Sequence, residues 1–153
     1  LKDAIWFFGA GRMRDAETLV DTQAPGSAPY IGTDAEKRYE GKLTFSLGGK
    51  HTLLANYQKI TRDQGNNSFG NIYDTASLYD RQLPQELISG NYSGTITDAL
   101  FLEAQYSERT FSFVGSGSRF TDPIFGTLMV NNNTGYRWWS PTFCGGCDDD
   151  PQP

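Results

Sequence analysis

Hydrophobic and polar residues alternate along several stretches of about ten residues, and this alternation is the main structural signal in the chain. In the clearest stretch, Leu43, Phe45 and Leu47 alternate with Thr44 and Ser46. A period of two places successive side chains on opposite faces of a strand. Strands are therefore predicted near residues 2–14, 38–48, 50–61, 85–96 and 98–113. The expected fold is all-β, an antiparallel meander of about five long strands.

The links between these strands differ in length on the two sides of the predicted sheet. Gly48-Gly49 and Thr97-Asp98 are two-residue turns, and glycine supplies the positive φ angles that such a hairpin turn requires. Long polar loops are predicted at 15–37, 62–84 and 114–153. Structureless connections of this length are uncommon in compact soluble domains. Short periplasmic turns and long outer loops are typical of outer-membrane barrels, so the meander is expected to be part of a transmembrane β-barrel.

The two faces of the predicted strands differ in chemistry. Leu43, Phe45, Leu53, Leu100 and Leu102 would contact lipid on one face. The opposite face would line a wet lumen, with Glu40, Lys42, Asn56, Gln58, Asn91, Glu103, Gln105 and Arg109. The tyrosines on the apolar face are expected to form an interfacial girdle, mostly toward the loop ends: Tyr39, Tyr57, Tyr92 and Tyr106. The alternative is that they are ordinary half-buried tyrosines of a soluble sandwich.

Composition excludes several classes of protein. The chain has 153 residues, of which 37% are hydrophobic and 14% aromatic. No apolar run approaches the roughly 18 residues that a membrane-spanning helix needs. The net charge of -5 argues against a nucleic-acid partner, because such proteins concentrate Lys and Arg. The chain opens directly in a predicted strand and ends in loop composition, so we expect an internal piece of a longer protein.

Three segments carry a resemblance to a known family. They are residues 2–9 (KDAIWFFG), 38–44 (RYEGKLT) and 51–57 (HTLLANY). Together they resemble the barrel of TonB-dependent outer-membrane receptors, and among these the Oar-like branch, whose members carry a carboxypeptidase-regulatory-like domain ahead of the plug. The resemblance covers about residues 2–113 and fades in the loops.

The resemblance implies a 22-stranded barrel closed by an N-terminal plug, in the bacterial outer membrane. A substrate bound from outside would enter when the TonB complex, driven by the inner-membrane proton gradient, pulls on the plug. The implied partners are outer-membrane lipid, the TonB complex through parts of the protein outside this chain, and a small substrate, for which an oligosaccharide, a peptide and a metal chelate are candidates. Neither plug nor TonB box lies in this sequence, so no energy-coupling residue is assigned.

Cys144 and Cys147 form the only thiol motif. In an extracellular loop, two nearby cysteines are expected to form a small local disulfide. A redox dithiol, which would precede a helix, and a metal pair, for which His51 is the only histidine, are the alternatives. The consecutive carboxylates of residues 148–150 do not follow the calcium-loop pattern, which favours a solvated acidic loop over a calcium site. We expect no metal and no cofactor.

The third predicted loop is rich in aromatic residues. Tyr136, Arg137, Trp138 and Trp139 form a possible ligand-contact segment, because aromatic faces stack on sugars or apolar ligands and Arg pairs with anions. The alternative is that these rings pack the loop on itself or return toward the bilayer interface.

No catalytic constellation is predicted, because His51 lies beside a turn without matched partners and the glycine pairs lack a following helix. The resemblance implies substrate uptake across the outer membrane, and we expect no enzymatic activity. Two alternatives are a soluble secreted β-sandwich that binds carbohydrate through Trp138 and Trp139, and a surface adhesion barrel without transport.

Overall fold

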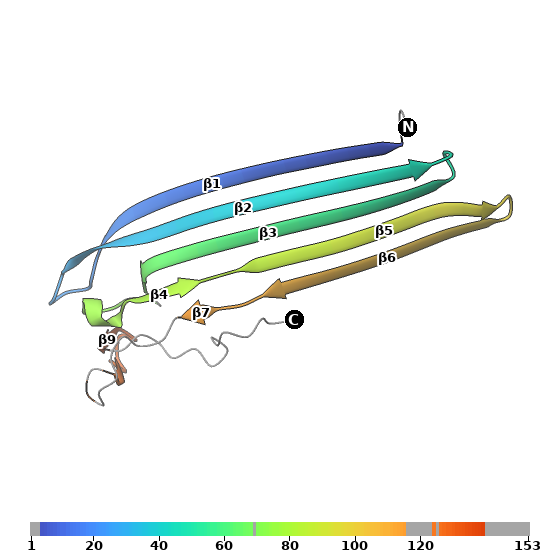
Figure 1. Ribbon diagram of the computed structural model, residues 1–153. Coiled ribbons are helices and arrows are strands. Elements are labelled where there is room, and N and C mark those ends of the chain that lie inside the picture. The colour runs from blue at the N-terminus through green and yellow to red at the C-terminus, as the bar shows by residue number, and fades with distance from the viewer. Residues whose placement is uncertain (1–3, 69, 116–123, 125, 140–153) are drawn as a thin grey trace.

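The computed structural model describes residues 4–68, 70–115, 124 and 126–139. It is an all-β antiparallel meander, drawn out into one long sheet (Figure 1). The first three strands are β1 (Ile5–Asp21), β2 (Pro29–Leu47) and β3 (His51–Asn67). Each pairs antiparallel with the next along the chain. The predicted all-β meander is confirmed.

The fourth and fifth long strands of the sheet are each interrupted once, so that each consists of two labelled strands: β4 (Tyr79–Gln82) and β5 (Gln85–Thr97) for the fourth, β6 (Leu100–Phe111) and β7 (Val114–Gly115) for the fifth. β3 pairs with β4 near the loops and with β5 near the turns. β5 pairs in turn with β6, and β4 pairs with β7. Pro84 lies between β4 and β5, where its missing N–H removes one ladder hydrogen bond. The sheet therefore consists of five consecutive long strands, the fourth and fifth of them broken near their loop ends.

The strands extend farther toward the loops than the sequence predicted. The predicted loop 15–37 is wrong in extent, since β1 continues to Asp21, β2 starts at Pro29, and only residues 22–28 connect them. The predicted loop 62–84 is likewise shortened by the end of β3 and by β4. In these extensions both faces are largely polar, so the hydrophobic alternation that identifies a strand is missing. Strand pairing with the neighbours supplies the order that the pattern does not reveal.

The predicted loop 114–153 also contains paired backbone. It holds β7 and a small hairpin of β8 (Leu128–Val130) and β9 (Arg137–Trp139). Residue 72 bridges to residue 137, which ties this hairpin to the end of β3–β4. The 3₁₀ helix η1 (Thr75–Ser77) lies beside it, capped by the Asp74 carboxylate, which accepts from the N–H of Ala76 at 2.9 Å. Among the described residues, no helix is long and apolar enough to cross a membrane.

Both tight turns lie at the same end of the sheet (Figure 1). Gly48 and Gly49 have φ angles of 61° and 68°, the positive values that were predicted for this turn, but Lys50 also belongs to the turn because Leu47 pairs with His51. The second turn is shifted by one residue, to Asp98-Ala99, because a bulge at Ile96 changes the register between β5 and β6. We call this end of the sheet the turn side, and the opposite end, with η1 and the β8–β9 hairpin, the loop side.

The buried hydrophobic residues of the described chain gather at the loop side. They are Ile72, Leu78, Tyr79 and Leu83, each at most 7% exposed. Large hydrophobic residues of the sheet itself stay exposed, with Phe7 at 87%. A soluble domain places its core against the middle of its sheet. Here the buried hydrophobic residues of the described chain lie at the loop-side end of the sheet, in β4 and in the connections around it.

Candidate functional site

The strand register brings the apolar residues into rows on one face of the sheet. Directly paired residues of antiparallel strands share a face. Phe7 pairs with Leu43, and Leu43 pairs with Ala55. We call this side the apolar face, and its turn-side half contains Ile5, Phe7, Leu43, Phe45, Leu47, Leu53, Ala55, Ile88, Leu102 and Ala104.

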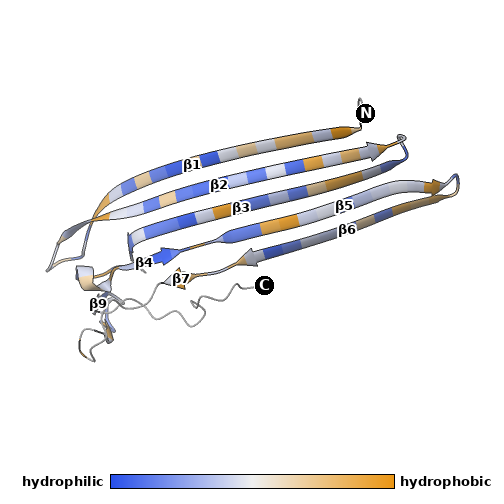
Figure 2. Cartoon of the chain, in the orientation of Figure 1, coloured by the Kyte–Doolittle hydropathy of each residue, from blue (hydrophilic) through white to orange (hydrophobic). Residues whose placement is uncertain are grey.

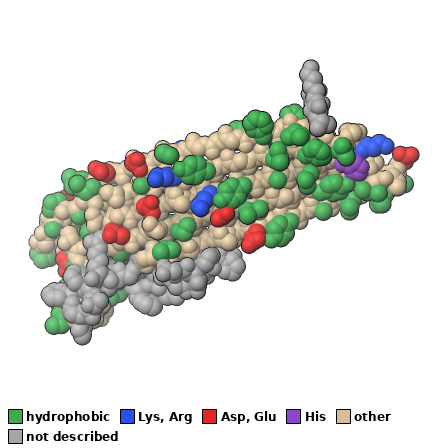
Figure 3. Space-filling model, in the orientation of Figure 1, with side chains coloured by type: hydrophobic (Ala, Val, Ile, Leu, Met, Phe, Trp, Pro, Cys, Tyr) green, Lys and Arg blue, Asp and Glu red, His purple; other side chains and the backbone are tan. Residues whose placement is uncertain are grey.

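The apolar face changes character midway along the strands. Hydrophobic residues concentrate on the turn side and hydrophilic ones on the loop side (Figure 2). In the space-filling view, hydrophobic side chains are dense over the turn-side half, whereas charged and hydrophobic side chains are mixed over the loop-side half (Figure 3). Beyond the apolar rows this face carries Asp15, Glu17, Lys37, Lys59, Asp63, Glu86 and Glu108, with the exposed hydrophobic residues Met13, Leu19 and Ile31 among them. The continuous apolar rows therefore form a band of limited height.

Tyrosines mark the loop-side limit of this band. Tyr39 pairs with Lys59, Tyr57 pairs with Gly41, and Tyr106 pairs with Gly90. The Tyr106 hydroxyl donates to the carboxylate of Glu108 at 2.8 Å, toward the polar half. Tyr92 differs: it pairs with Leu53 nearer the turns, and its hydroxyl lies 2.8 Å from Nδ1 of His51.

All eight residues predicted to line a lumen lie on the opposite face, which we call the polar face. Glu40 pairs with Gln58, and Lys42 pairs with Asn56. Asn91 pairs with Gln105, and its amide donates to Glu103 at 3.5 Å. Arg109 pairs with Leu87 and donates to Gln85 at 3.0 Å. This face also carries apolar side chains on the turn side, among them Trp6, Phe8 and Leu54.

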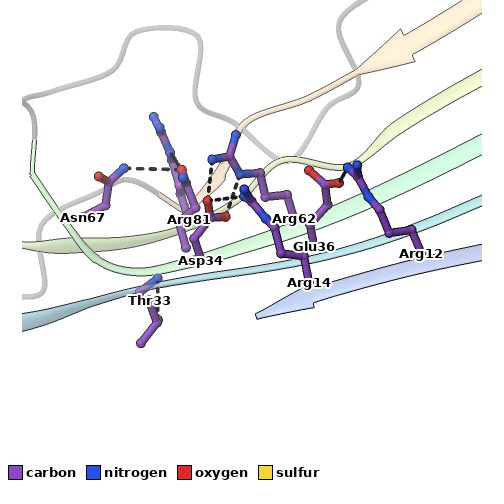
Figure 4. Close-up of polar contacts among 10 residues, drawn as sticks. Arg12, Arg14, Thr33, Asp34, Glu36, Arg62, Asn67 and Arg81 are labelled. Atoms are coloured by element: carbon purple, nitrogen blue, oxygen red, sulfur yellow. Dashed lines mark hydrogen bonds and ion pairs between the residues drawn. The ribbon is translucent and has the colours of Figure 1, made fainter. Parts of the chain in front are cut away.

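A network of charges crosses three strands on the loop-side half of the polar face (Figure 4). Asp34 on β2 accepts two hydrogen bonds from Arg62 on β3, at 2.7 and 2.6 Å. It also accepts from Arg14 on β1 at 2.8 Å. Nearer the turns on the same two strands, Arg12 of β1 donates a hydrogen bond to Glu36 of β2. We call these five residues the arginine network.

Neighbouring groups extend the network along and across the sheet. Arg38 donates to Glu40 at 3.0 Å. Turning the Gln58 amide to face Arg38 gives two further bonds from the guanidinium, at 3.1 and 2.9 Å. Arg81 on β4 donates to Gln64 on β3 at 2.6 Å. The sequence did not predict this network, because most of its members fell within segments predicted to be loops. The regular spacing of Arg12, Arg14, Asp34 and Glu36 was the available signal.

Charge is divided unequally between the two faces. The chain is acidic, with a net charge of -5. The polar face nevertheless has more cations than carboxylates, with Arg12, Arg14, Arg38, Lys42, Arg62, Arg81 and Arg109 against Asp34, Glu36, Glu40 and Glu103. The acidic excess lies on the loop-side half of the apolar face. The electrostatic potential over the polar face is therefore more positive than the net charge of the chain suggests.

The network shifts the ionisation of its acids. Hydrogen bonds from Arg62 lower the pKa of Asp34 below its ordinary value, and the hydrogen bond from Arg12 lowers the pKa of Glu36. An acid whose pKa is lower when folded stabilises the fold above its unfolded pKa, and this stabilisation is lost as the pH falls through the folded value. The window therefore lies below about pH 4, the ordinary range of these carboxyls.

Pepsin cleavage of the loop-side strand extensions is therefore expected to accelerate as the pH is lowered from about 5 to about 2, because protonated Asp34 and Glu36 no longer hold the three strands together. The measurement is the rate of cleavage within residues 15–21 and 29–36, followed by mass spectrometry and divided at each pH by the rate for unfolded peptides of the same segments, because pepsin itself loses activity as the pH rises toward about 5. In the double variant Asp34→Asn, Glu36→Gln, this normalised rate should already be high at pH 5 and change little below it. An equally steep pH dependence in this variant would contradict the assignment.

The aromatic segment predicted to contact ligand packs largely on its own loop. The ring of Tyr73 lies 5.2 Å from that of Tyr136 and 5.6 Å from that of Trp138, both edge-on. The backbone of Arg137 bonds to Asn71 and Tyr73, and the N–H of Trp139 donates to Asp74 at 3.4 Å. These four residues are half-buried and pack on the loop-side connections, and a ligand-contact role for them stays a prediction.

Cys144 and Cys147 and residues 148–150 lie outside the described residues. Within the described part of the chain, no group of three or more His, Cys, Asp and Glu side chains is arranged to hold a metal. The site that the structure does assemble is the polar face with its arginine network.

Comparison of the chain with protein-family models, with curated proteins and with solved structures gives no match.

Proposed function

We propose that the chain is part of a transmembrane β-barrel of the bacterial outer membrane. The observation that carries this proposal is the exposed apolar band bounded by tyrosines. On β2 it runs from Tyr39 to Leu47, and nine residues at about 3.3 Å each span about 30 Å along the strand. A tilt of about 40° reduces this to about 23 Å, close to the apolar band of about 25 Å on outer-membrane barrels.

The open edges of the sheet support the same proposal. Among the described strands, β1 pairs only with β2 and β6 only with β5. Each therefore presents a row of unpaired backbone groups along one side. In lipid every backbone N–H and C=O needs a partner, and a closed barrel provides one. Further strands of a longer protein would satisfy these edges, and the apolar face would then contact acyl chains.

Within this class, we propose a TonB-dependent receptor of the Oar-like branch, with uptake of a small substrate as its function. The support is the resemblance of residues 2–9, 38–44 and 51–57 to the barrels of that family, together with strands long enough to project beyond the bilayer. The polar face would line the lumen, and the arginine network would stand above the level of the tyrosines. Outer-membrane lipid and the TonB complex are the proposed partners.

A soluble carbohydrate-binding sandwich would need a second layer over the apolar face. Among the described residues, the only second sheet is the β8–β9 hairpin, which lies at the loop side (Figure 1). The turn-side rows have no such cover, and Phe7, Leu43 and Leu102 are each at least 48% exposed. These observations favour the barrel.

The test is expression of the full-length protein, including the reading frame before Leu1, which is expected to encode a plug. The protein should fractionate with the outer membrane, require detergent for extraction, and migrate faster on an SDS gel before heating than after it. As a control, the isolated segment 1–153 should stay insoluble in buffer, because its apolar face and both edges are exposed. A monomeric, folded and soluble segment would overturn the proposal.

A further inference from the structure

Two arginines oppose each other across β1 and β2 on the polar face. Arg12 is the direct register partner of Arg38. Directly opposed residues in antiparallel strands have their Cβ atoms about 5 Å apart, and like charges in this position destabilise the pair. The nearby carboxylates belong to other register pairs: Glu36 pairs with Arg14, and Glu40 pairs with Ala10. The two arginines therefore face each other while each is paired with one carboxylate, Glu36 for Arg12 and Glu40 for Arg38, and a ligand would bind to the donors that these ion pairs leave unused.

A depression lies between these two arginines. It has a volume of about 210 Å³ and is lined by Ala10, Gly11, Arg12, Arg38 and Glu40. The small side chain of Ala10, which lies on the same face as both arginines, leaves room beside the guanidinium groups. Pockets for whole drug-sized ligands start at about 300 Å³. This depression therefore suits a single charged group of a larger substrate.

Both guanidinium groups keep donors for a ligand. Within the described residues, Arg12 donates to Glu36 through Nη2 alone, and Arg38 uses Nε and Nη2 toward Gln58 and Glu40. The side chain of Arg12 is 62% exposed and that of Arg38 is 38% exposed. The planar fork of Arg matches the oxygens of carboxylate and phosphate groups.

We propose that Arg12 and Arg38 form an anion-binding site, and that the substrate taken up through this barrel carries a carboxylate or phosphate group that binds there. The uptake of this substrate through the barrel rests on the proposed function. The anion-binding site itself is argued from the register, the depression and the unused guanidinium donors. The cation excess over the whole polar face would raise the local concentration of such a substrate.

The experiment is equilibrium dialysis of the detergent-purified, full-length protein against radiolabelled citrate and, separately, radiolabelled phosphate at low ionic strength. Binding of at least one of these anions is expected, and added salt should weaken it. Arg12→Gln and Arg38→Gln should each weaken binding about tenfold, as expected for loss of one charge-assisted bond. Arg12→Lys keeps the charge without the fork and should weaken binding less.

Lys37→Gln is the matched control. Lys37 is next to Arg38 on β2 but lies on the opposite face, so the variant makes the same change in charge without touching the depression. It should bind both anions as the unaltered protein does. Faster gel migration before heating than after it confirms that each variant is folded. Binding of neither anion, equal loss in Lys37→Gln, or unchanged binding in both arginine variants would overturn the anion site. The barrel assignment is tested separately, by fractionation with the outer membrane.

Discussion

Replacing Leu43 with Arg is expected to block assembly of the full-length protein in the outer membrane. Leu43 lies in the middle rows of the apolar band, between Phe7 and Ala55. A cation at the bilayer midplane of a barrel costs about 2–4 kcal/mol, and the cost falls toward the interfaces. Leu102 lies four residues to the turn side of Tyr106, as Leu43 does of Tyr39, so Leu102→Arg should have a similar cost. The measurement is the amount of heat-modifiable protein in the outer-membrane fraction, with the free energy of folding into lipid vesicles.

Thr44→Arg and Gln105→Arg are the matched controls. Thr44 is the sequence neighbour of Leu43 and lies on the polar face, and so does Gln105. Both variants should assemble normally, because a charge in a wet lumen stays solvated. An equal loss of assembled protein in Leu43→Arg and Thr44→Arg would mean that both faces of the sheet are buried in the same kind of environment. That result would reject the lipid-facing assignment and favour a soluble, two-layered fold.

Replacing Asp34 with Asn is expected to loosen the loop-side extensions of β1, β2 and β3 together. Asp34 is the acceptor for both Arg14 and Arg62, so its loss leaves two neighbouring cations without their shared counter-charge. Hydrogen bonds to charged groups contribute about 1.5–3 kcal/mol each, and partial exposure lowers that figure. A local loss of about 1–2 kcal/mol is expected. Amide hydrogen exchange of the full-length protein should therefore accelerate within 15–21, 30–36 and 61–66.

The turn-side halves of the same strands provide the internal control for Asp34→Asn, and their exchange should be unchanged. Glu103→Gln is the variant control, because the bond that Glu103 accepts within the described part of the chain is a long, exposed one from Asn91. Adding Arg62→Gln to Asp34→Asn should cost less than the sum of the single changes, since the two residues share one interaction. Additive effects of the two changes would show that the pair is not coupled.

The turn side of the sheet was predictable from the sequence because two independent local signals agree there. Residues 39–47 alternate with a strict period of two, and Gly48-Gly49 requires a tight hairpin. The structure has both features, and the register places Leu43, Phe45 and Leu53 on one face as the alternation implied. A one-residue shift would reverse the faces of a strand, so the hydrophobic pattern strongly specifies the register.

The loop side was not predictable in the same way. Residues 30–36 are mixed in polarity and carry no hydrophobic alternation, although they form the paired start of β2. Their order comes from long-range partners such as Asp34 with Arg62, which are 28 residues apart in the chain. A prediction from residue propensities uses only residues that are close together in the chain, so it does not detect such distant pairs. The arginine network was therefore missed together with the strands that carry it.

The sequence by itself determined the all-β class, the number of long strands, the Gly48-Gly49 turn and which residues share a face, because each follows from local periodicity or from backbone sterics. The tertiary structure decided how far the strands extend, where the packed core lies, and that Arg12 opposes Arg38. Those features depend on which distant residues the register brings together. The free energy of such pairings comes from contacts between strands, and no single strand contains that information.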